Sequence, residues 1–323
     1  MRSSLPIIPL DAACSCLTVV RAKREAYVED GYFREGWHHV SAAWGAEVFD
    51  MLERVALILF KPEALATSRD LAVPAILGEF DMAVAATALV CYDSRLLQSI
   101  WHYNISVATI DRLVIQTRYA CPSRSYLLAV VGRRGQVPVS VRLKRLKGSA
   151  SSAPASATLR GRLGSPNGLL NFLHTSEEPA DFVRELAISL PWAERQRVLN
   201  ALKLALTGTE PALKPSTPKV PRRKMQLELN RAVRRLADKL GVASEGDDQL
   251  RARREAVLHY VKAARNGQAQ FRAEEFAAHL EGFSLPEPDL DLYVLCTYLI
   301  PFNREGRAPL ATEDDLAVWE HRT

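Results

Sequence analysis

The sequence has no apolar run long enough to cross a membrane. A spanning helix needs about 20 consecutive apolar residues, and the 323-residue chain contains no such stretch. Its first residues, MRSSLPIIPLDAACSCLTVV, include a short apolar stretch interrupted by Pro6, Pro9 and Asp11, which makes a poorly formed signal peptide. We therefore expect a protein with no membrane partner.

Cysteine is scarce. The five cysteines are an odd number and show no disulfide-framework spacing, so we expect reduced thiols in a cytoplasm. Cys14 and Cys16 could start a metal site, but no matching pair follows, and we interpret their proximity as incidental.

Acidic residues are absent from a long internal window. None lies between Asp111 and Glu177, although the net charge of the whole chain is only +5. A field of one sign concentrates anions, and arginine forks fit phosphate oxygens. A solvated basic face is the alternative, but such faces usually interleave both signs, so we favour a phosphate site. The basic residues of the window are Arg112, Arg118, Arg124, Arg133, Arg134, Arg142, Lys144, Arg145, Lys147, Arg160 and Arg162.

Short apolar runs alternate with amphipathic helical patterns along the first two thirds of the chain. We expect helices over 64–80, over 94–118 in two pieces, over 136–147, and after Pro179 at a first helical position. The order predicts an α+β fold, a ferredoxin-like split βαβ antiparallel sheet with helices on one face. The expected strands are 54–60, 82–92, 125–132 and 169–174.

The length suits two domains, and the composition marks their boundaries. Residues 1–53 form an N-terminal extension with a helix over 36–53, and 54–207 form the α+β domain. Four prolines and a basic end make 208–224 a linker. Residues 225–323 are mostly helical by pattern. The basic helix at its start allows contact with nucleic acid, but we favour a helix with a solvated polar face.

Three short motifs lie at the ends of expected elements. Lys61-Pro62-Glu63-Ala64 follows the first strand, Thr158-Leu159-Arg160-Gly161 lies in a loop, and Asn171 to Glu177 spans the end of the fourth strand. In this order they resemble the nucleoside diphosphate kinase family over about residues 54–190. That family carries Lys-Pro-Asp-Ala, Thr-Ile-Arg-Gly and Asn-x-x-His-Gly-Ser-Asp. Thr175 replaces the glycine, so a β-branched residue stands where a tight turn is expected.

The resemblance implies a ping-pong phosphotransferase with a histidine nucleophile. His174 would take the γ-phosphoryl group of a nucleoside triphosphate and pass it to a nucleoside diphosphate or to a specialised acceptor. Glu185 would hold the other ring nitrogen, while Lys61 and Arg160 would supply positive charge at the phosphates. Mg²⁺ would arrive on the nucleotide, as in ATP-binding enzymes generally.

The resemblance also assigns nucleotide contacts to five further residues. Asn171 matches a contact to the sugar, and Ser149 and Arg145 lie near positions that contact phosphate. Tyr103 lies near a family tyrosine, and Arg112 is the nearest candidate for a second pocket arginine. No residue stands out as the aromatic that stacks on the base.

Two functional hypotheses follow. The first is a nucleoside diphosphate kinase-like transferase that works through phospho-His174, as a homo-oligomer smaller than the family's hexamers or tetramers. The alternative is a non-catalytic nucleotide- or nucleic-acid-binding module on the same fold. An isolated histidine at a strand end is most often structural, and the accompanying motifs favour the nucleophile here.

Overall fold

The protein is described by a computed structural model that covers residues 10–150, 154–208, 219–220, 222, 224–310 and 318–320. Residues 209–218, the greater part of the expected linker, lie outside this description. No helix within these ranges combines the length and the apolar character that crossing a membrane requires.

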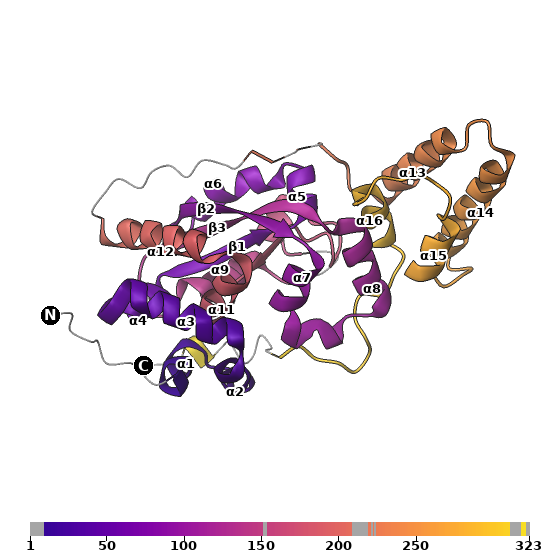
Figure 1. Ribbon diagram of the computed structural model, residues 1–323. Coiled ribbons are helices and arrows are strands. Elements are labelled where there is room, and N and C mark those ends of the chain that lie inside the picture. The colour runs from indigo at the N-terminus through magenta and orange to yellow at the C-terminus, as the bar shows by residue number, and fades with distance from the viewer. Residues whose placement is uncertain are drawn as a thin grey trace.

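Four antiparallel strands form one sheet in the order β2-β3-β1-β4 (Figure 1). The expectation of an α+β protein with an antiparallel sheet is therefore confirmed. The fourth strand is shorter than expected, because Leu169 and Leu170 instead donate their backbone N–H groups to the side-chain oxygen of Asn167. The strands are β1 (Val55–Phe60), β2 (Met82–Tyr92), β3 (Ser123–Gly132) and β4 (Leu173–Thr175).

Helices cover both faces of the sheet, so the expectation of helices on one face is wrong. Every residue of β1 is buried. Ile58 and Phe60 join one apolar cluster, while Leu57 and Leu59 join the other. Successive strand residues point to opposite faces, and a strand buried on both sides reads as the continuous apolar run VALILF.

The N-terminal helices cover the face of Leu57 and Leu59 together with α7, α11 and α12. Asp30 begins α3 by accepting a hydrogen bond from the backbone N–H of Phe33. The expected single helix over 36–53 is divided, because α3 ends before Gly45, whose φ is 59°. These elements are α1 (Leu10–Leu17), α2 (Arg21–Glu29), α3 (Gly31–Trp44), η1 (Gly45–Glu47), α4 (Val48–Glu53), α7 (Ser94–Ile100), α11 (Pro179–Ser189) and α12 (Trp192–Thr207).

The opposite face carries α6, α9, α10 and much of the C-terminal helical region. A short helix, α10, includes Leu159, Arg160 and Gly161, which the sequence predicts to lie in a loop. The elements on this side and at the hairpin are α5 (Pro62–Ala66), η2 (Arg69–Ala72), α6 (Val73–Gly78), η3 (His102–Val107), α8 (Ile110–Ile115), the π-helical turn η4 (Gln116–Ala120), α9 (Val139–Lys147) and α10 (Leu159–Leu163).

The C-terminal helices share an apolar cluster with the sheet. The backbone N–H of Ala273 donates to Asp111 Oδ1 at 2.7 Å, and the rings of Tyr119 and Phe276 lie 6.5 Å apart. In Figure 1, α13, α14 and α15 project from one end of the molecule, while α16 lies closer to the sheet. Their bounds, with the last turn, are α13 (Leu229–Ala243), α14 (Asp248–Arg265), α15 (Ala273–His279), α16 (Leu290–Cys296) and η5 (Val318–Glu320).

The close packing of α3 on α11 yields a stability prediction. A Cβ atom at Gly36 would overlap the carbonyl oxygen of Val183, whereas one at Gly31, in the same helix, would meet nothing within 4 Å. Overpacking typically costs about 1–3 kcal/mol, so we expect Gly36→Ala to lower the free energy of unfolding by that amount and Gly31→Ala to leave it within about 0.5 kcal/mol. Urea unfolding of both variants measures this, and equal midpoints would contradict the packing described.

Candidate active site

A cavity of about 520 Å³ opens where β1 ends, beside β4. Its size lies within the range of about 300–1,000 Å³ typical of small-molecule sites. Of the nine expected site residues, Arg145 alone does not line it. The eight that do are His174, Glu185, Lys61, Tyr103, Arg112, Ser149, Arg160 and Asn171.

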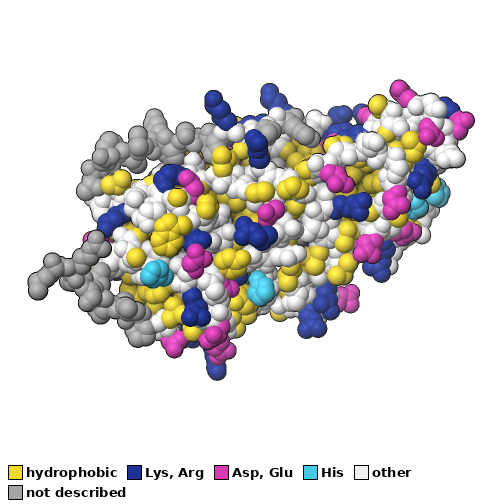
Figure 2. Space-filling view, in the orientation of Figure 1, with side chains coloured by type: hydrophobic (Ala, Val, Ile, Leu, Met, Phe, Trp, Pro, Cys, Tyr) yellow, Lys and Arg dark blue, Asp and Glu magenta, His cyan; other side chains and the backbone are white. Residues whose placement is uncertain are grey.

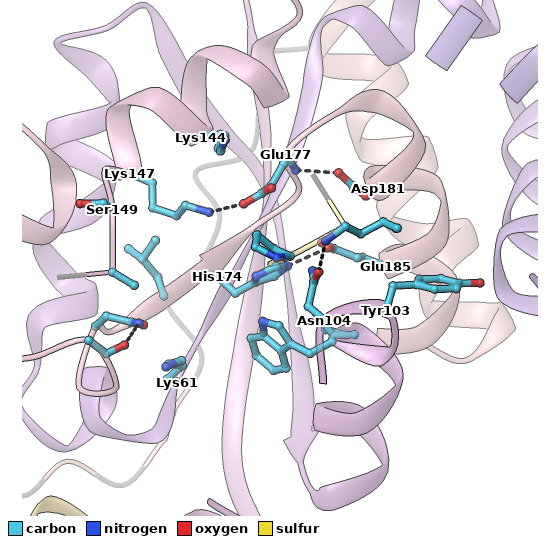
Figure 3. A pocket seen from close by; sticks show the side chains of 18 of the residues that line it. Lys61, Tyr103, Asn104, Lys144, Lys147, Ser149, His174, Glu177, Asp181 and Glu185 are labelled. Carbon is cyan, nitrogen blue, oxygen red and sulfur yellow. Dashed lines mark hydrogen bonds and ion pairs between the residues drawn. The ribbon is translucent and has the colours of Figure 1, made fainter. Parts of the chain in front are cut away.

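His174 is the central residue of the three-residue strand β4 and lies opposite Leu59 of β1. Its Nε2 lies 2.7 Å from Oε1 of Glu185, which α11 presents from the adjacent helix (Figure 3). The imidazole side chain is 14% exposed and meets the ring of Trp101 edge-on, with centroids 5.1 Å apart. The carboxylate orients the ring and engages Nε2, which leaves Nδ1 as the nitrogen available for attack.

The chain enters β4 through a strained residue. Phe172 is fully buried and has a φ of 67°, a conformation that non-glycine residues rarely adopt. Its carbonyl accepts a hydrogen bond from the backbone N–H of Lys61, and its own N–H donates to Glu63. Such strain persists only where the surroundings enforce it. The positive φ of Phe172 sets the direction in which the chain enters β4 and therefore the position of His174.

Thr175 does not occupy a tight turn. It continues β4 opposite Ile58, and it is not among the residues with positive φ. The expectation of a tight turn at this position is therefore wrong, because the residue with positive φ is Phe172, ahead of the histidine.

Lys61 is buried at the end of β1, and its Nζ donates to the carbonyl of Leu169 at 2.8 Å. The carboxylate of Glu63 lies 3.9 Å away and is itself buried. Burial lowers the pKa of Lys61 to about 8, and Glu63 partly opposes this. Burial also raises the pKa of Glu63. The Lys61 ammonium is therefore expected to lose its proton, and its charge, near pH 8.

Arg160 reaches the cavity from α10, which Thr158 caps by accepting from the backbone N–H of Gly161. Its guanidinium donates to the carbonyls of Gly148 and Leu173, at 2.8 and 3.1 Å. Burial lowers its pKa to about 10. Both carbonyl partners are neutral, and no ion pair joins Arg160 to a carboxylate among the described residues, so its charge can act on a bound anion.

Arg112 and Asn171 present polar atoms to the same cavity. Arg112 donates to Oδ1 of Asn303 at 2.9 Å, and burial lowers its pKa. Asn171 donates to the carbonyl of Gly168 at 2.7 Å, whereas its Oδ1 is buried and has no hydrogen-bond partner among the described residues. A ligand hydroxyl or amine could satisfy this oxygen.

The remaining three expected residues, Tyr103, Ser149 and Arg145, have weaker links to the cavity around His174. The Tyr103 hydroxyl donates to Oδ2 of Asp30 at 2.9 Å, and Figure 3 shows its ring turned away from His174. Ser149 lines the cavity at an exposed position. Arg145 lies on the exposed side of α9, while Lys144 on the same helix lines the cavity.

The sequence motifs did not identify three lysines that line the cavity, Lys23, Lys144 and Lys147. Lys144 and Lys147 lie three residues apart on α9 and share one helix face. Lys147 Nζ lies 3.0 Å from Glu177 (Figure 3). Burial alone would raise the pKa of Glu177. The positive charges of Lys147, Lys23 and Lys144 outweigh burial and hold this pKa well below its usual range. The acid-free window contains Lys144 and Lys147 and could have indicated them.

Lys23, from α2, had no such signal. Its Nζ lies 3.0 Å from Glu178 and 2.7 Å from Asp181, and all three side chains are buried. Tyr27 of the same helix lines the cavity and donates to Asp181 at 2.6 Å. The N-terminal extension therefore forms part of the site wall and fixes the start of α11.

Among the described residues that line the cavity around His174, lysines and arginines outnumber carboxylates. Within the part of the chain that the structure describes, no group of three or more His, Cys, Asp or Glu side chains is arranged to hold a metal ion. A scan against models of known protein families finds no match to this chain, and a search of curated proteins finds none either.

The lowered pKa of Lys61 predicts a pH dependence of anion binding. Below about pH 8 the ammonium is charged and attracts phosphate, and above it that charge is lost. We expect the affinity for inorganic tripolyphosphate to fall between pH 7 and pH 9 by up to about tenfold, since one pKa unit corresponds to about 1.4 kcal/mol.

Lys61→Arg is the control, because an arginine keeps its charge over this range. Calorimetric titration at constant ionic strength measures both proteins, so that the ligand's own ionisation cancels in the comparison. An identical pH profile for the two would contradict the assignment to Lys61.

Proposed function

We propose that this protein is a phosphotransferase of the nucleoside diphosphate kinase type, which carries a phosphoryl group on His174 between nucleotides or to a specialised acceptor. The observation that carries the proposal is the 2.7 Å contact between His174 Nε2 and Glu185, inside a cavity that Lys61 and Arg160 also line. Phosphoryl transfer requires a nucleophile, here an imidazole that a carboxylate orients, and positive charge at the phosphate oxygens.

The strand order supports the same proposal. Across the sheet the strands lie in the order β2-β3-β1-β4 with every neighbouring pair antiparallel, which is the arrangement of a ferredoxin-like split βαβ sheet. Lys61 and His174 lie near each other because β1 and β4 are neighbours and Leu59 pairs with His174. We infer a ferredoxin-like core for the segment from β1 to α11.

The proposed transfer follows from the ring geometry. In this scheme Nε2 keeps its proton and donates a hydrogen bond to Glu185, so the lone pair of the ring lies on Nδ1. Nδ1 forms a bond to the γ-phosphorus as the bond from phosphorus to the β,γ-bridging oxygen breaks, and the nucleoside diphosphate leaves. Glu185 stabilises the positive charge that develops on the ring. The reverse steps with a second diphosphate regenerate the free histidine.

The cations have distinct parts in this scheme. Arg160 and Lys61 would face the charge on the equatorial oxygens, which spreads in the transition state. The free Oδ1 of Asn171 suits a donor such as a sugar hydroxyl. Mg²⁺ would enter bound to the nucleoside triphosphate and would neutralise part of its charge.

The alternative of a nucleic-acid-binding surface has less support. On the face shown in Figure 2, basic and acidic side chains are interspersed rather than gathered into one basic patch. The basic residues Lys61, Lys144, Lys147 and Arg160 are buried around the cavity instead. Such an arrangement fits a small phosphorylated ligand better than a long polyanion.

Labelling with γ-³²P-ATP and Mg²⁺ tests the proposal. We expect the purified protein to acquire label that is stable in base and lost in acid, as a phosphoramidate is, and to release it when a nucleoside diphosphate is added. His174→Asn should abolish labelling. Arg160→Ala should slow it by about 10²–10³-fold, the usual effect of removing one group that stabilises transition-state charge.

Arg145→Ala provides the matched control, because it removes an arginine from the same basic window that does not line the cavity. Its labelling rate should stay within about twofold of the unmodified protein, a difference of less than about 0.5 kcal/mol in the barrier. A protein that binds ATP but takes no label would instead support the non-catalytic module. Label retained in His174→Asn would show that another residue is the acceptor.

A further inference from the structure

The segment from Pro301 to Leu310, which we name the C-terminal strap, forms part of the wall of the cavity. It follows α16 of the helical region and supplies lining side chains far from every motif in the sequence. The lining residues of the strap are Phe302, Asn303, Pro309 and Leu310.

Backbone hydrogen bonds fix the first part of the strap against the turn that precedes α8. The N–H of Thr109 donates to the carbonyl of Phe302 at 3.2 Å, and the N–H of Arg304 donates to the carbonyl of Val107 at 2.8 Å. These bonds flank the antiparallel bridge between Ala108 and Asn303. The position of Asn303 is therefore set on both sides by main-chain contacts.

Thr109 locks this junction to the helix. Its hydroxyl accepts from the backbone N–H of Arg112 as the cap of α8, and donates to the carbonyl of Pro301 at 2.7 Å. At the far end, the N–H of Leu310 donates to Oδ1 of Asn104 at 2.7 Å. The strap thus spans the helical hairpin between η3 and α8.

Asn303 is placed where it directs the Arg112 guanidinium. Its Oδ1 accepts from Nη1 of Arg112 at 2.9 Å. The Nε of Arg112 is buried without a hydrogen-bond partner, and no carboxylate forms an ion pair with this arginine in the described ranges. The neutral amide of Asn303 holds the Arg112 guanidinium in place and leaves its positive charge available. A carboxylate in the same position would neutralise that charge.

Phe302 secures the other edge of the strap. A Cβ atom at Gly168 would lie 3.1 Å from Cδ2 of the Phe302 ring, so the ring rests directly on the backbone of the loop that precedes Asn171. The absence of a side chain at Gly168 makes room for this contact. The strap therefore contacts both the turn that precedes α8 and the loop that precedes Asn171.

We propose that the C-terminal strap completes the phosphate site, with Asn303 as the positioning residue that aims Arg112 at the phosphate chain of the ligand. This inference rests on the proposed function in treating the cavity as a phosphate site. It assigns a role in that site to the C-terminal region, which lies outside the segment that carries the motifs.

A double-mutant cycle on ligand binding tests the proposal. The probe is inorganic tripolyphosphate, titrated calorimetrically in EDTA into the full-length protein, Asn303→Ala, Arg112→Ala and the double variant. We expect Arg112→Ala to weaken binding by about tenfold or more and Asn303→Ala by about three- to tenfold. Asn303→Ala should add nothing once Arg112 is gone.

Asn303→Asp separates positioning from a merely structural role. An aspartate would pair with Arg112 more strongly, so a structural role predicts restored binding and an unchanged or raised melting temperature. A positioning role predicts weaker tripolyphosphate binding than in Asn303→Ala, because the new carboxylate cancels the charge of the arginine. Arg304→Ala, which removes only a contact with the carbonyl of Ser106, is the control for disturbance of the strap.

The outcomes distinguish this inference from the proposed reaction. Coupled losses at Asn303 and Arg112, in a protein that takes no label from ATP, would support the strap's role while the reaction failed. Normal labelling with an unchanged affinity in Asn303→Ala would overturn the inference alone. Equal losses for Asn303→Ala with and without Arg112, restored binding in Asn303→Asp, or no tripolyphosphate binding by the unmodified protein would each overturn it as well.

Discussion

The contact between Nε2 of His174 and Oε1 of Glu185, 2.7 Å long, is the interaction on which the rest of the site depends. It requires a three-residue edge strand and a separate helix to keep a fixed register. The helix is held at its start by a capping box between Glu178 and Asp181 and by Pro179 at its first turn. Because both partners are only slightly exposed, the carboxylate can orient the ring without competition from water.

Glu178 ties the two ends of the chain to this helix. It accepts hydrogen bonds from Thr18 and Lys23 of the N-terminal region, and also from Nε1 of Trp319 at 2.9 Å. All four side chains are buried. A buried carboxylate is tolerated only when its charge and lone pairs are satisfied, so the N-terminal helices and the C-terminal tryptophan are structural requirements of the site rather than appendages.

Three cations that line the cavity, the buried Lys61 and Arg160 and the half-buried Arg112, have fewer carboxylate partners. Arg160 and Arg112 donate to neutral oxygens, and Lys61 keeps a 3.9 Å separation from Glu63. Burying Arg160 without an ion-pair partner is unfavourable for folding, and strain at Phe172 adds to that cost. Side chains held in this way are expected where an anionic ligand binds.

The sequence predicts those parts of the fold that local patterns control. The bounds of β2 agree with the apolar run 82–92, and Pro179 begins α11 as its position indicates. The motifs also bring Lys61, Arg160 and His174 to one cavity. Long-range packing decides the rest: helices on both faces, a shortened β4, and a strap from residue 301 onward have no local signature. At α9, motif spacing selected Arg145, whereas the helix turns Lys144 and Lys147 toward the cavity.

The most direct test of the account is the nitrogen of His174 that carries phosphorus. Protein labelled with ¹⁵N in its histidines, treated with ATP and Mg²⁺, can be examined by ³¹P–¹⁵N correlation NMR. Because Glu185 engages Nε2, we predict a ³¹P resonance coupled to Nδ1 of His174, while Nε2 keeps its proton. Phosphorus on Nε2, or on another residue, would contradict it.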